Sequence, residues 1–274
     1  MRAQCHHSLS ECTAMSWPVL FVSHGSPMLA VEPGRTGAVL AQWSAAQPAK
    51  PEGILVVSPH WMGQGLAVST RDRQIAWHDF GGFPPELYQL QYGPAGSPGL
   101  AARVRQVLAA AAIEAADDAR RPLDHGAWVP LRYLYPQADV PVVQLALDVG
   151  RDARAQYELG RALAPLREEG VLIIGSGSLT HNLRDVRMPR SAPPSAYVPG
   201  FQQWYADRLA EGDLEALFDW QARAPGASQA HPHDDHLMPL YVALGAGGLP
   251  ARRLNDEVSY AALAMDAYQF GTAD

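Results

Sequence analysis

Cysteine is nearly absent from this 274-residue chain, in which Cys5 and Cys12 are the only two. A chain of this length buries enough apolar surface to fold without a covalent cross-link. We therefore expect two free thiols in a reducing cytoplasm and no disulfide framework. The sequence also has no apolar run close to the roughly 20 residues that cross a bilayer, which argues against a membrane protein.

Basic residues are outnumbered, with 21 lysines and arginines against 28 aspartates and glutamates and a formal charge of -7. Without a basic field to collect phosphates, nucleic acid is not an expected partner, and a small molecule is. Residues 1–14 hold one arginine and no apolar segment, so they do not resemble a secretory signal. We expect them to be a disordered extension, followed by one domain over residues 15–274.

Several familiar catalytic motifs are missing. The GSGS run at 175–178 lacks the third glycine of a dinucleotide fingerprint, and the sequence contains neither GxxxxGK[ST] nor GxSxG. Ser26 follows His24 by two residues but is a weak candidate nucleophile, because a base must lie within hydrogen-bond distance in space.

Short apolar runs rich in β-branched residues alternate with helical patterns. Such runs predict strands that are buried on both faces of a sheet, here at 18–23, 53–58, 141–147 and 170–177. The helical patterns cover 97–113, 153–169 and 196–220. This order predicts a single-domain α/β fold with a central, mostly parallel sheet flanked by helices.

Three histidines follow predicted strands. His24 comes after the first, His60 after the second and His181 after the fourth. The carboxyl ends of parallel strands are where open α/β sheets form their binding sites. Because neutral imidazole is a good ligand for zinc, iron, copper and nickel, the pattern favours a metal site at this edge.

The segment HPHDDH at 231–236 can supply a further ligand. His236 stands directly before LMPLYVALGAG, which predicts a buried helix, so it is the histidine tied to an ordered element. His231 and His233 lie in a proline-containing loop without the i, i+4 spacing of HExxH, and we expect them to be structural. His125 and His78 are candidates for proton transfer, or for ordinary capping and surface positions.

Seven motifs occur in an order that is typical of one family. They are FVSHGSPM, VVSPHW, HDFGGFPPELYQLQYGPAGSP, LDHGAWVPLRYLYP, PVVQLALD, GSGSLTHNLRDV and HLMPLY. Together they resemble the class III extradiol ring-cleaving dioxygenases, in the 4,5-DOPA dioxygenase-like branch. The resemblance runs from about residue 18 to 245 and makes residues 15–274 a catalytic domain.

The resemblance implies a mononuclear metal site with His24, His60 and His236 as ligands, Asp235 being the fallback carboxylate. It implies Fe(II), a small catechol and O2, although an all-histidine set is also familiar for Zn(II). A zinc-dependent hydrolase and a non-catalytic metal-binding relative are the alternatives.

The same resemblance implies that His181 is the catalytic acid and base and that His125 lies beside the substrate. A metal-binding protein without activity needs neither histidine, so their presence favours an enzyme. The long loop 76–98, rich in glycine, proline and aromatic residues, is expected to cover the substrate pocket. His78, Phe80 and Tyr92 are its candidate pocket residues.

Overall fold

The computed structural model describes residues 16–271. The predicted extension 1–14 and both cysteines lie outside the described residues. Within 16–271, no helix has the length and apolar character needed to cross a membrane.

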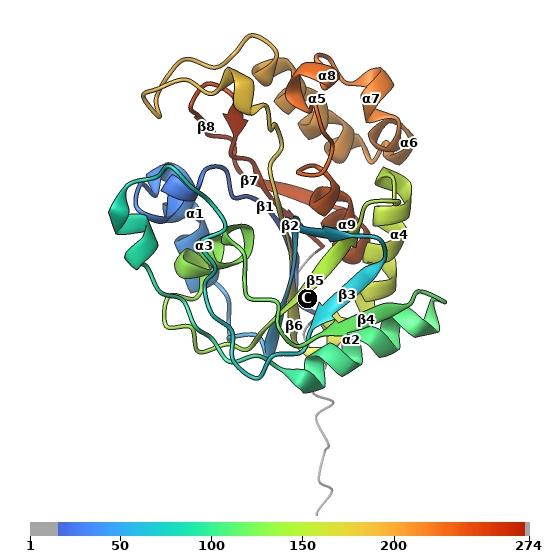
Figure 1. Ribbon diagram of the computed structural model, residues 1–274. Helices are drawn as coiled ribbons and strands as arrows, with labels where there is room; N and C mark the ends of the chain where they lie inside the picture. The colour runs from blue at the N-terminus through green and yellow to red at the C-terminus, as the bar shows by residue number, and fades with distance from the viewer. Residues whose placement is uncertain (1–15, 272–274) are drawn as a thin grey trace, which may run out of the picture.

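An eight-stranded sheet forms the centre of the molecule, in the order β4-β3-β5-β2-β6-β1-β10-β7 (Figure 1). The four central strands β5, β2, β6 and β1 are mutually parallel. On the outer sides, β3 runs antiparallel to β5, and β10 and β7 are antiparallel additions to β1. The sheet strands are β1 (Val19–Ser23), β2 (Gly53–Gly63), β3 (Leu66–Ser69), β4 (Ala115–Asp118), β5 (Val142–Asp148), β6 (Val171–Gly177), β7 (Ala251–Asn255) and β10 (Ala267–Phe270). A separate hairpin pairs β8 (Val258–Ser259) with β9 (Leu263–Ala264).

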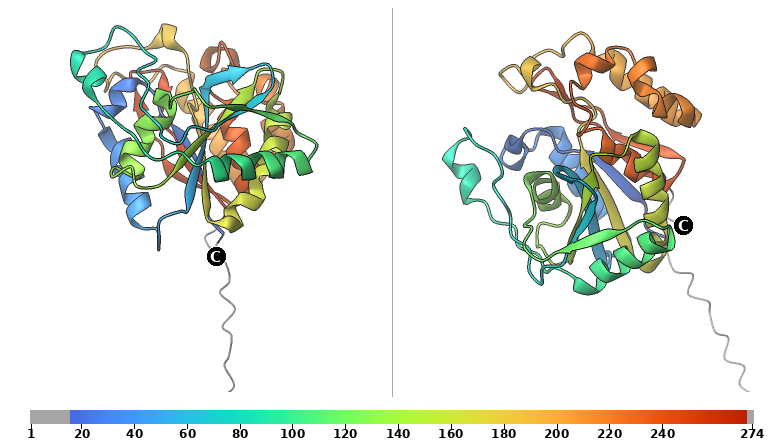
Figure 2. Two further views of the ribbon diagram at one scale, coloured as in Figure 1. Left: turned by 60° about the horizontal axis from the view of Figure 1, so that its bottom comes forward. Right: turned by 45° about the vertical axis from the view of Figure 1, so that its right-hand side comes forward.

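Helices cover both faces of the sheet (Figure 2). Successive strand residues point to opposite faces, so Phe21 joins the core under α2, α4, α5 and α9, while Leu20 joins the core under α1 and α3. This double burial explains the near-continuous apolar strands and confirms the predicted α/β fold. The helices are α1 (Gly34–Ala45), α2 (Pro98–Ala110), α3 (His125–Leu134), α4 (Ala153–Leu163), α5 (Val198–Glu211), α6 (Leu214–Phe218), α7 (Trp220–Arg223), α8 (Ala227–Ala230) and α9 (Met238–Gly247). Short 3-10 turns are η1 (Pro27–Ala30), η2 (Pro85–Gln89), η3 (Ala164–Glu169) and η4 (Leu183–Asp185).

Two predictions of local structure need correction. The helix expected over 196–220 is broken, because Gly212 ends α5 in the left-handed region (φ +71) and Asp213 caps α6. His60 does not follow its strand but lies within β2, whose pairing with β5 shifts between Val57 and Met62. The irregular pairing lets β2 continue beside β5 to Gly63, past the point at which its pairing with β6 ends at Val57.

Two irregular segments stand at the carboxyl edge of the sheet. Residues 76–98 contain only η2 as a regular turn before α2 begins. Residues 186–195 run alongside the β8–β9 hairpin, where the amide of Arg187 donates to Tyr260 O at 2.9 Å and the amide of Tyr260 donates to Arg190 O at 2.8 Å.

Candidate active site

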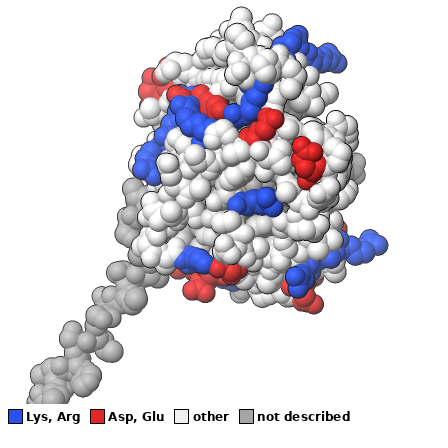
Figure 3. All heavy atoms as spheres, turned by 90° about the vertical axis from the view of Figure 1, so that its left-hand side faces the viewer, with Lys and Arg blue, Asp and Glu red and all other residues white. Residues whose placement is uncertain are grey.

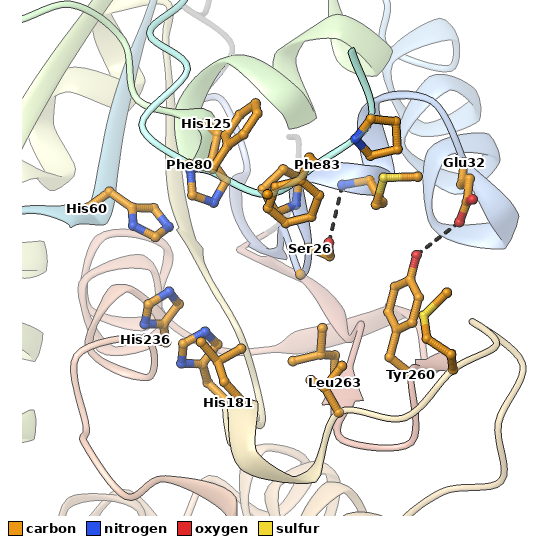
Figure 4. Close-up of a pocket in the computed structure, with 18 residues that line it drawn as sticks. Ser26, Glu32, His60, Phe80, Phe83, His125, His181, His236, Tyr260 and Leu263 are labelled. Carbon is orange, nitrogen blue, oxygen red and sulfur yellow. Dashed lines mark hydrogen bonds between the residues drawn. The ribbon is translucent and has the colours of Figure 1, made fainter. Parts of the chain in front are cut away.

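Five histidines from separate segments of the chain meet at the carboxyl edge of the sheet, and Figure 4 shows four of them, His60, His125, His181 and His236. The ring centroids of His24, His60 and His236 lie 5.0–5.4 Å from one another. His125, the first residue of α3, lies 4.0 Å from His60. His181 stacks on His236 at 3.5 Å with an interplanar angle of 8°. The structure therefore brings together all five histidines that were expected to hold the metal or act beside it.

Ser176 fixes the orientation of His24. Its hydroxyl donates to Gly126 O at 2.5 Å, so its oxygen accepts from His24 Nδ1 at 3.0 Å. The Nε2 lone pair of His24 is then directed at His60 Nε2, 3.1 Å away. Gly126 leaves room for this arrangement, since a Cβ there would lie 3.1 Å from both His24 Cε1 and His60 Cδ2 and closer still to Ser58 Oγ.

Two aspartates orient the rings of His236 and His125, each by accepting a hydrogen bond from Nδ1. Oδ1 of Asp235 accepts from the backbone amide of His236 at 2.8 Å and from its Nδ1 at 3.0 Å. Oδ1 of Asp79 accepts from the backbone amide of His125 at 3.0 Å and from its Nδ1 at 2.9 Å. Both rings then carry their proton on Nδ1 and leave Nε2 free, which is how metal-site histidines are usually oriented.

Buried Asp124 ties three elements of the site together. It caps α3 by accepting from the amide of Ala127 at 3.2 Å, and it accepts from Ser58 Oγ of β2 at 2.8 Å. Gln144 of β5 donates to its second oxygen. The cap therefore fixes the start of α3, and with it His125, against the two strands.

Arg121 supports the backbone of His60. Its guanidinium donates to His60 O at 2.6 Å and lies 5.3 Å from the ring of Trp61 and 4.8 Å from that of Trp77. Such cation–π contacts help to hold a guanidinium in place. The irregular part of β2 is thus braced from outside the sheet.

Burial keeps four of the five histidines uncharged. Desolvation, followed by the neighbouring histidines, lowers the pKa of His24 and His236 well below the usual 6.5. Desolvation is also the main cause that lowers the pKa of His60 and of His181 to about 4. Metal ions bind neutral imidazole, so at neutral pH these rings are in the ligating form.

The donor atoms fit a metal ion. Ligand atoms of His24, His60 and His125 all lie within 4.8 Å of one another, as do those of His181, Asp235 and His236. Two imidazoles at about 2.0–2.1 Å from one ion place their nitrogens about 3 Å apart, and the His24–His60 separation is 3.1 Å. The expected ligand His236 belongs to the second of these groups, and its ring centroid lies 5.4 Å from that of His24 and 5.0 Å from that of His60. Its Nδ1 donates to Oδ1 of Asp235.

A cavity of about 620 Å³ opens from the histidines. This volume lies in the range of small-molecule sites. Its wall is mostly apolar and includes Met28, Phe80, Phe83 and Leu263, while Glu32 and Tyr260 lie at the end away from the histidines (Figure 4). An aromatic ring fits such a wall by burial of its faces.

Of the three pocket residues expected in the loop 76–98, only Phe80 lines the cavity. His78 Nε2 lies 3.1 Å from Leu90 O, and the Tyr92 hydroxyl donates to Tyr135 O at 3.1 Å. Both side chains are engaged inside the loop packing instead.

The first histidine of HPHDDH is structural, as expected. His231 is 5% exposed, its Nε2 donates to Leu179 O at 2.8 Å, and its ring packs against Phe201 and Trp220. His233 is exposed. The segment therefore directs one of its three histidines to the cluster.

Comparison with known proteins agrees with this geometry. Residues 18–271 match the family model described as the catalytic LigB subunit of aromatic ring-opening dioxygenase. The chain belongs to this family. It is a ring-cleaving dioxygenase of the extradiol class, which confirms the resemblance drawn from its motifs.

Relatives are found in plants and bacteria. A 4,5-DOPA dioxygenase extradiol of Beta vulgaris is 42% identical over 231 residues, covering 83% of this chain and 86% of that protein. One of Escherichia coli K12 is 34% identical over 259 residues, covering 93% and 94%. The crystal structure of an uncharacterized Escherichia coli K12 protein matches with a TM-score of 0.77 at 29% identity, covering 93% of this chain and 99% of that one.

Several residues of the dioxygenase site were missed at the level of sequence. Asp79, Ser176 and Asp124 act on ring nitrogens or backbone, and Glu32 and Tyr260 line the cavity. Asp79 and Asp124 each stand next to a candidate histidine in the sequence, which was an available signal. Ser176, Glu32 and Tyr260 had none.

Proposed function

We propose that the protein opens the ring of a small, substituted catechol next to its two hydroxyl groups. His24, His60 and His236 would hold Fe(II), and both atoms of O2 would enter a product of the hydroxymuconic semialdehyde type. The observation that carries the proposal is the convergence of buried imidazoles at the end of an apolar cavity, with Nδ1 of His24 and of His236 hydrogen-bonded elsewhere so that Nε2 is left for a metal ion. The 4,5-DOPA dioxygenase names of the relatives support a DOPA-like ring.

Fe(II), when bound, supplies Lewis acidity towards the catechol oxygens and the electron-transfer chemistry that O2 requires. The residues of the protein position the catechol ring. Phe80 and Phe83 border the space beside the histidines and exclude water from the ring. Holding the ring close to the cluster removes much of the entropic cost of bringing the reactants together.

His181 is the proposed acid and base. Burial lowers its pKa to about 4, so at pH 7 it is neutral and able to accept a proton from a catechol hydroxyl. The charge of Asp235 works against that lowering and stabilises the protonated ring. His125, with Nδ1 held by Asp79, offers Nε2 to a substrate oxygen.

Oxygen consumption tests the proposal. Metal-free protein is loaded anaerobically with Fe(II) and then mixed with air-saturated buffer and a panel of catechols that includes DOPA and caffeate. We expect one O2 consumed for each catechol and a yellow ring-opened product. Protein loaded with Zn(II) is the control and should consume none.

Absence of O2 uptake with every catechol, in protein shown to hold Fe(II), would refute the dioxygenase proposal. Uptake that yields a quinone instead of a ring-opened product would also refute it, because that reaction oxidises the diol without breaking the ring.

A further inference from the structure

The outer end of the cavity carries a single formal charge. Among the described residues that line it, Glu32 is the only carboxylate and there is no lysine or arginine. Glu32 follows η1 and lies across the cavity from the histidines (Figure 4). A ligand with its ring at the cluster therefore has its substituent near this one negative charge.

Tyr260 holds this carboxylate in place. Its hydroxyl donates to Glu32 Oε2 at 2.9 Å, and the side chain is 6% exposed. Burial, together with the hydrogen bond and charge of Glu32, raises the pKa of this hydroxyl to about 12, so it stays a donor. Within residues 16–271, Glu32 Oε1 makes no hydrogen bond and is available to a ligand.

The backbone of Tyr260 is fixed in an uncommon conformation. Tyr260 (φ +53) and Ala261 (φ +65) are consecutive non-glycine residues in the left-handed region. The amide of Ser195 donates to Ala261 O at 2.8 Å, in addition to the bonds that join Tyr260 to residues 187 and 190. The backbone that carries the Tyr260 side chain is therefore held by hydrogen bonds to residues 187, 190 and 195.

Two arginines of an adjoining cleft are already paired with acidic residues. Arg190 meets Glu257 at 2.9 Å and Arg35 meets Asp256, in a neighbouring cleft that shares Glu32 and Met188 with the cavity. On the face shown in Figure 3, basic and acidic side chains likewise lie beside one another. A carboxylate on the ligand would face Glu32 and compete with an acidic side chain for either arginine.

We propose that the ring substituent of the substrate ends in a cationic amine, which Glu32 receives, and that Tyr260 is a positioning residue for Glu32. This inference rests on the proposed ring cleavage. It narrows the substrate class to catechols with an amine and no carboxylate on a short side chain, ahead of neutral and acidic catechols. DOPA, with both charges, ranks below the simple amine.

Three catechols with the same short chain but different charge test the inference. They are dopamine, 4-ethylcatechol and 3-(3,4-dihydroxyphenyl)propionate. We expect kcat/KM to fall in that order. Glu32 is exposed, so Glu32→Gln should lower the value for dopamine by about 1.5- to 5-fold, the range of an exposed ion pair, and change the value for 4-ethylcatechol less. Glu32→Lys should place the propionate ahead of dopamine.

Two further variants separate position from charge. Tyr260→Phe should raise the KM of dopamine without changing its kcat, since the carboxylate remains but is no longer held. Glu114→Gln makes the same charge change at an exposed site beyond α2 and should leave the order intact. Thermal unfolding confirms that each variant folds.

An unchanged order of the three catechols in folded Glu32→Gln and Glu32→Lys proteins would overturn the inference while the ring cleavage stands. If wild-type protein opens no catechol, the proposed function fails, and binding decides the inference separately. Calorimetry under argon with Zn(II)-loaded protein should then show the lowest Kd for dopamine. Equal Kd values for all three would overturn it.

Discussion

The histidine end and the outer end of the cavity are built from different parts of the fold. At the histidine end, His24, His125 and His236 are 1–6% exposed and lie at the ends of a strand or helix. At the outer end, Glu32 is exposed and Met188 is 77% exposed, and both belong to chain outside the sheet and the long helices.

This difference in structure separates the residues that we expect to carry out the reaction from those that we expect to select the substrate. Strands in a hydrogen-bonded sheet have a fixed register, so side chains at their ends are held to within a fraction of an ångström, as catalysis requires. Loops tolerate substitution with little effect on the sheet. We therefore expect changes at the histidine end to alter metal binding and turnover, and changes at the outer end to alter the choice of substrate.

The largest expected effect distinguishes two neighbouring histidines. His236→Ala should abolish stoichiometric metal binding, because it removes a proposed ligand, while His125→Ala should retain the metal and lose turnover. Metal content after dialysis, measured by elemental analysis, checks both. The opposite result would assign His125, which groups with His24 and His60 within 4.8 Å, as the third ligand.

Removal of His181 should affect the reaction alone. We expect His181→Ala to lower kcat by about 10² to 10⁴, the usual contribution of a general acid or base, with the metal content unchanged. Rapid mixing of the anaerobic substrate complex with O2 measures the ring-opening rate directly. Unaltered turnover would remove His181 from the proton-transfer role.

Acid should destabilise the metal-free protein because its buried histidines resist protonation. His60, His181 and His231 have pKa values lowered from 6.5 to about 4. The unfolded chain takes up these protons first, so the stability they provide is present above pH 6.5 and is lost as the pH falls towards 4. Urea unfolding between pH 7.5 and 4.5 measures this loss.

His231→Gln sharpens the acid prediction, since His231 is buried away from the cavity. Between pH 6.5 and 4, the unfolding free energy of the variant should fall by about 3 kcal/mol less than that of the wild type, because the variant lacks the lowered pKa of His231. Asp266 acts in the opposite direction. Burial raises its pKa from 3.8 to about 6, so its contribution falls as the pH rises through that interval. If His231→Gln loses as much unfolding free energy in acid as the wild type, the prediction for His231 is wrong.

A smaller effect is expected from the hydroxyl that orients His24. Ser176→Ala should weaken metal binding by about 10- to 100-fold, as is usual for partners of metal ligands. Competition with a chelator of known affinity measures the change. Ser178→Ala is the matched control, because that buried hydroxyl donates to Thr180 O at 2.7 Å and serves no histidine of the cluster.

The sequence predicted the sheet well where strands are buried on both faces, because their apolar runs have no other explanation. It missed β4 and β7, whose partly exposed residues are not continuously apolar, and the four-residue strands β3 and β10, which are too short to give a clear pattern. His24, His60 and His181 were predictable from their places at the ends of apolar runs. The pairing of His24 with Ser176 and of His125 with Asp79 was not, since these residues lie 152 and 46 positions apart.

The absence of a side chain at Gly126 has a consequence for the packing of the cluster. A Cβ atom at residue 126 would lie 3.1 Å from the rings of His24 and His60 and closer still to Ser58 Oγ. The close packing of the histidines therefore depends on glycine at this position. Alanine at this place would require Ser58 or the rings of His24 and His60 to shift.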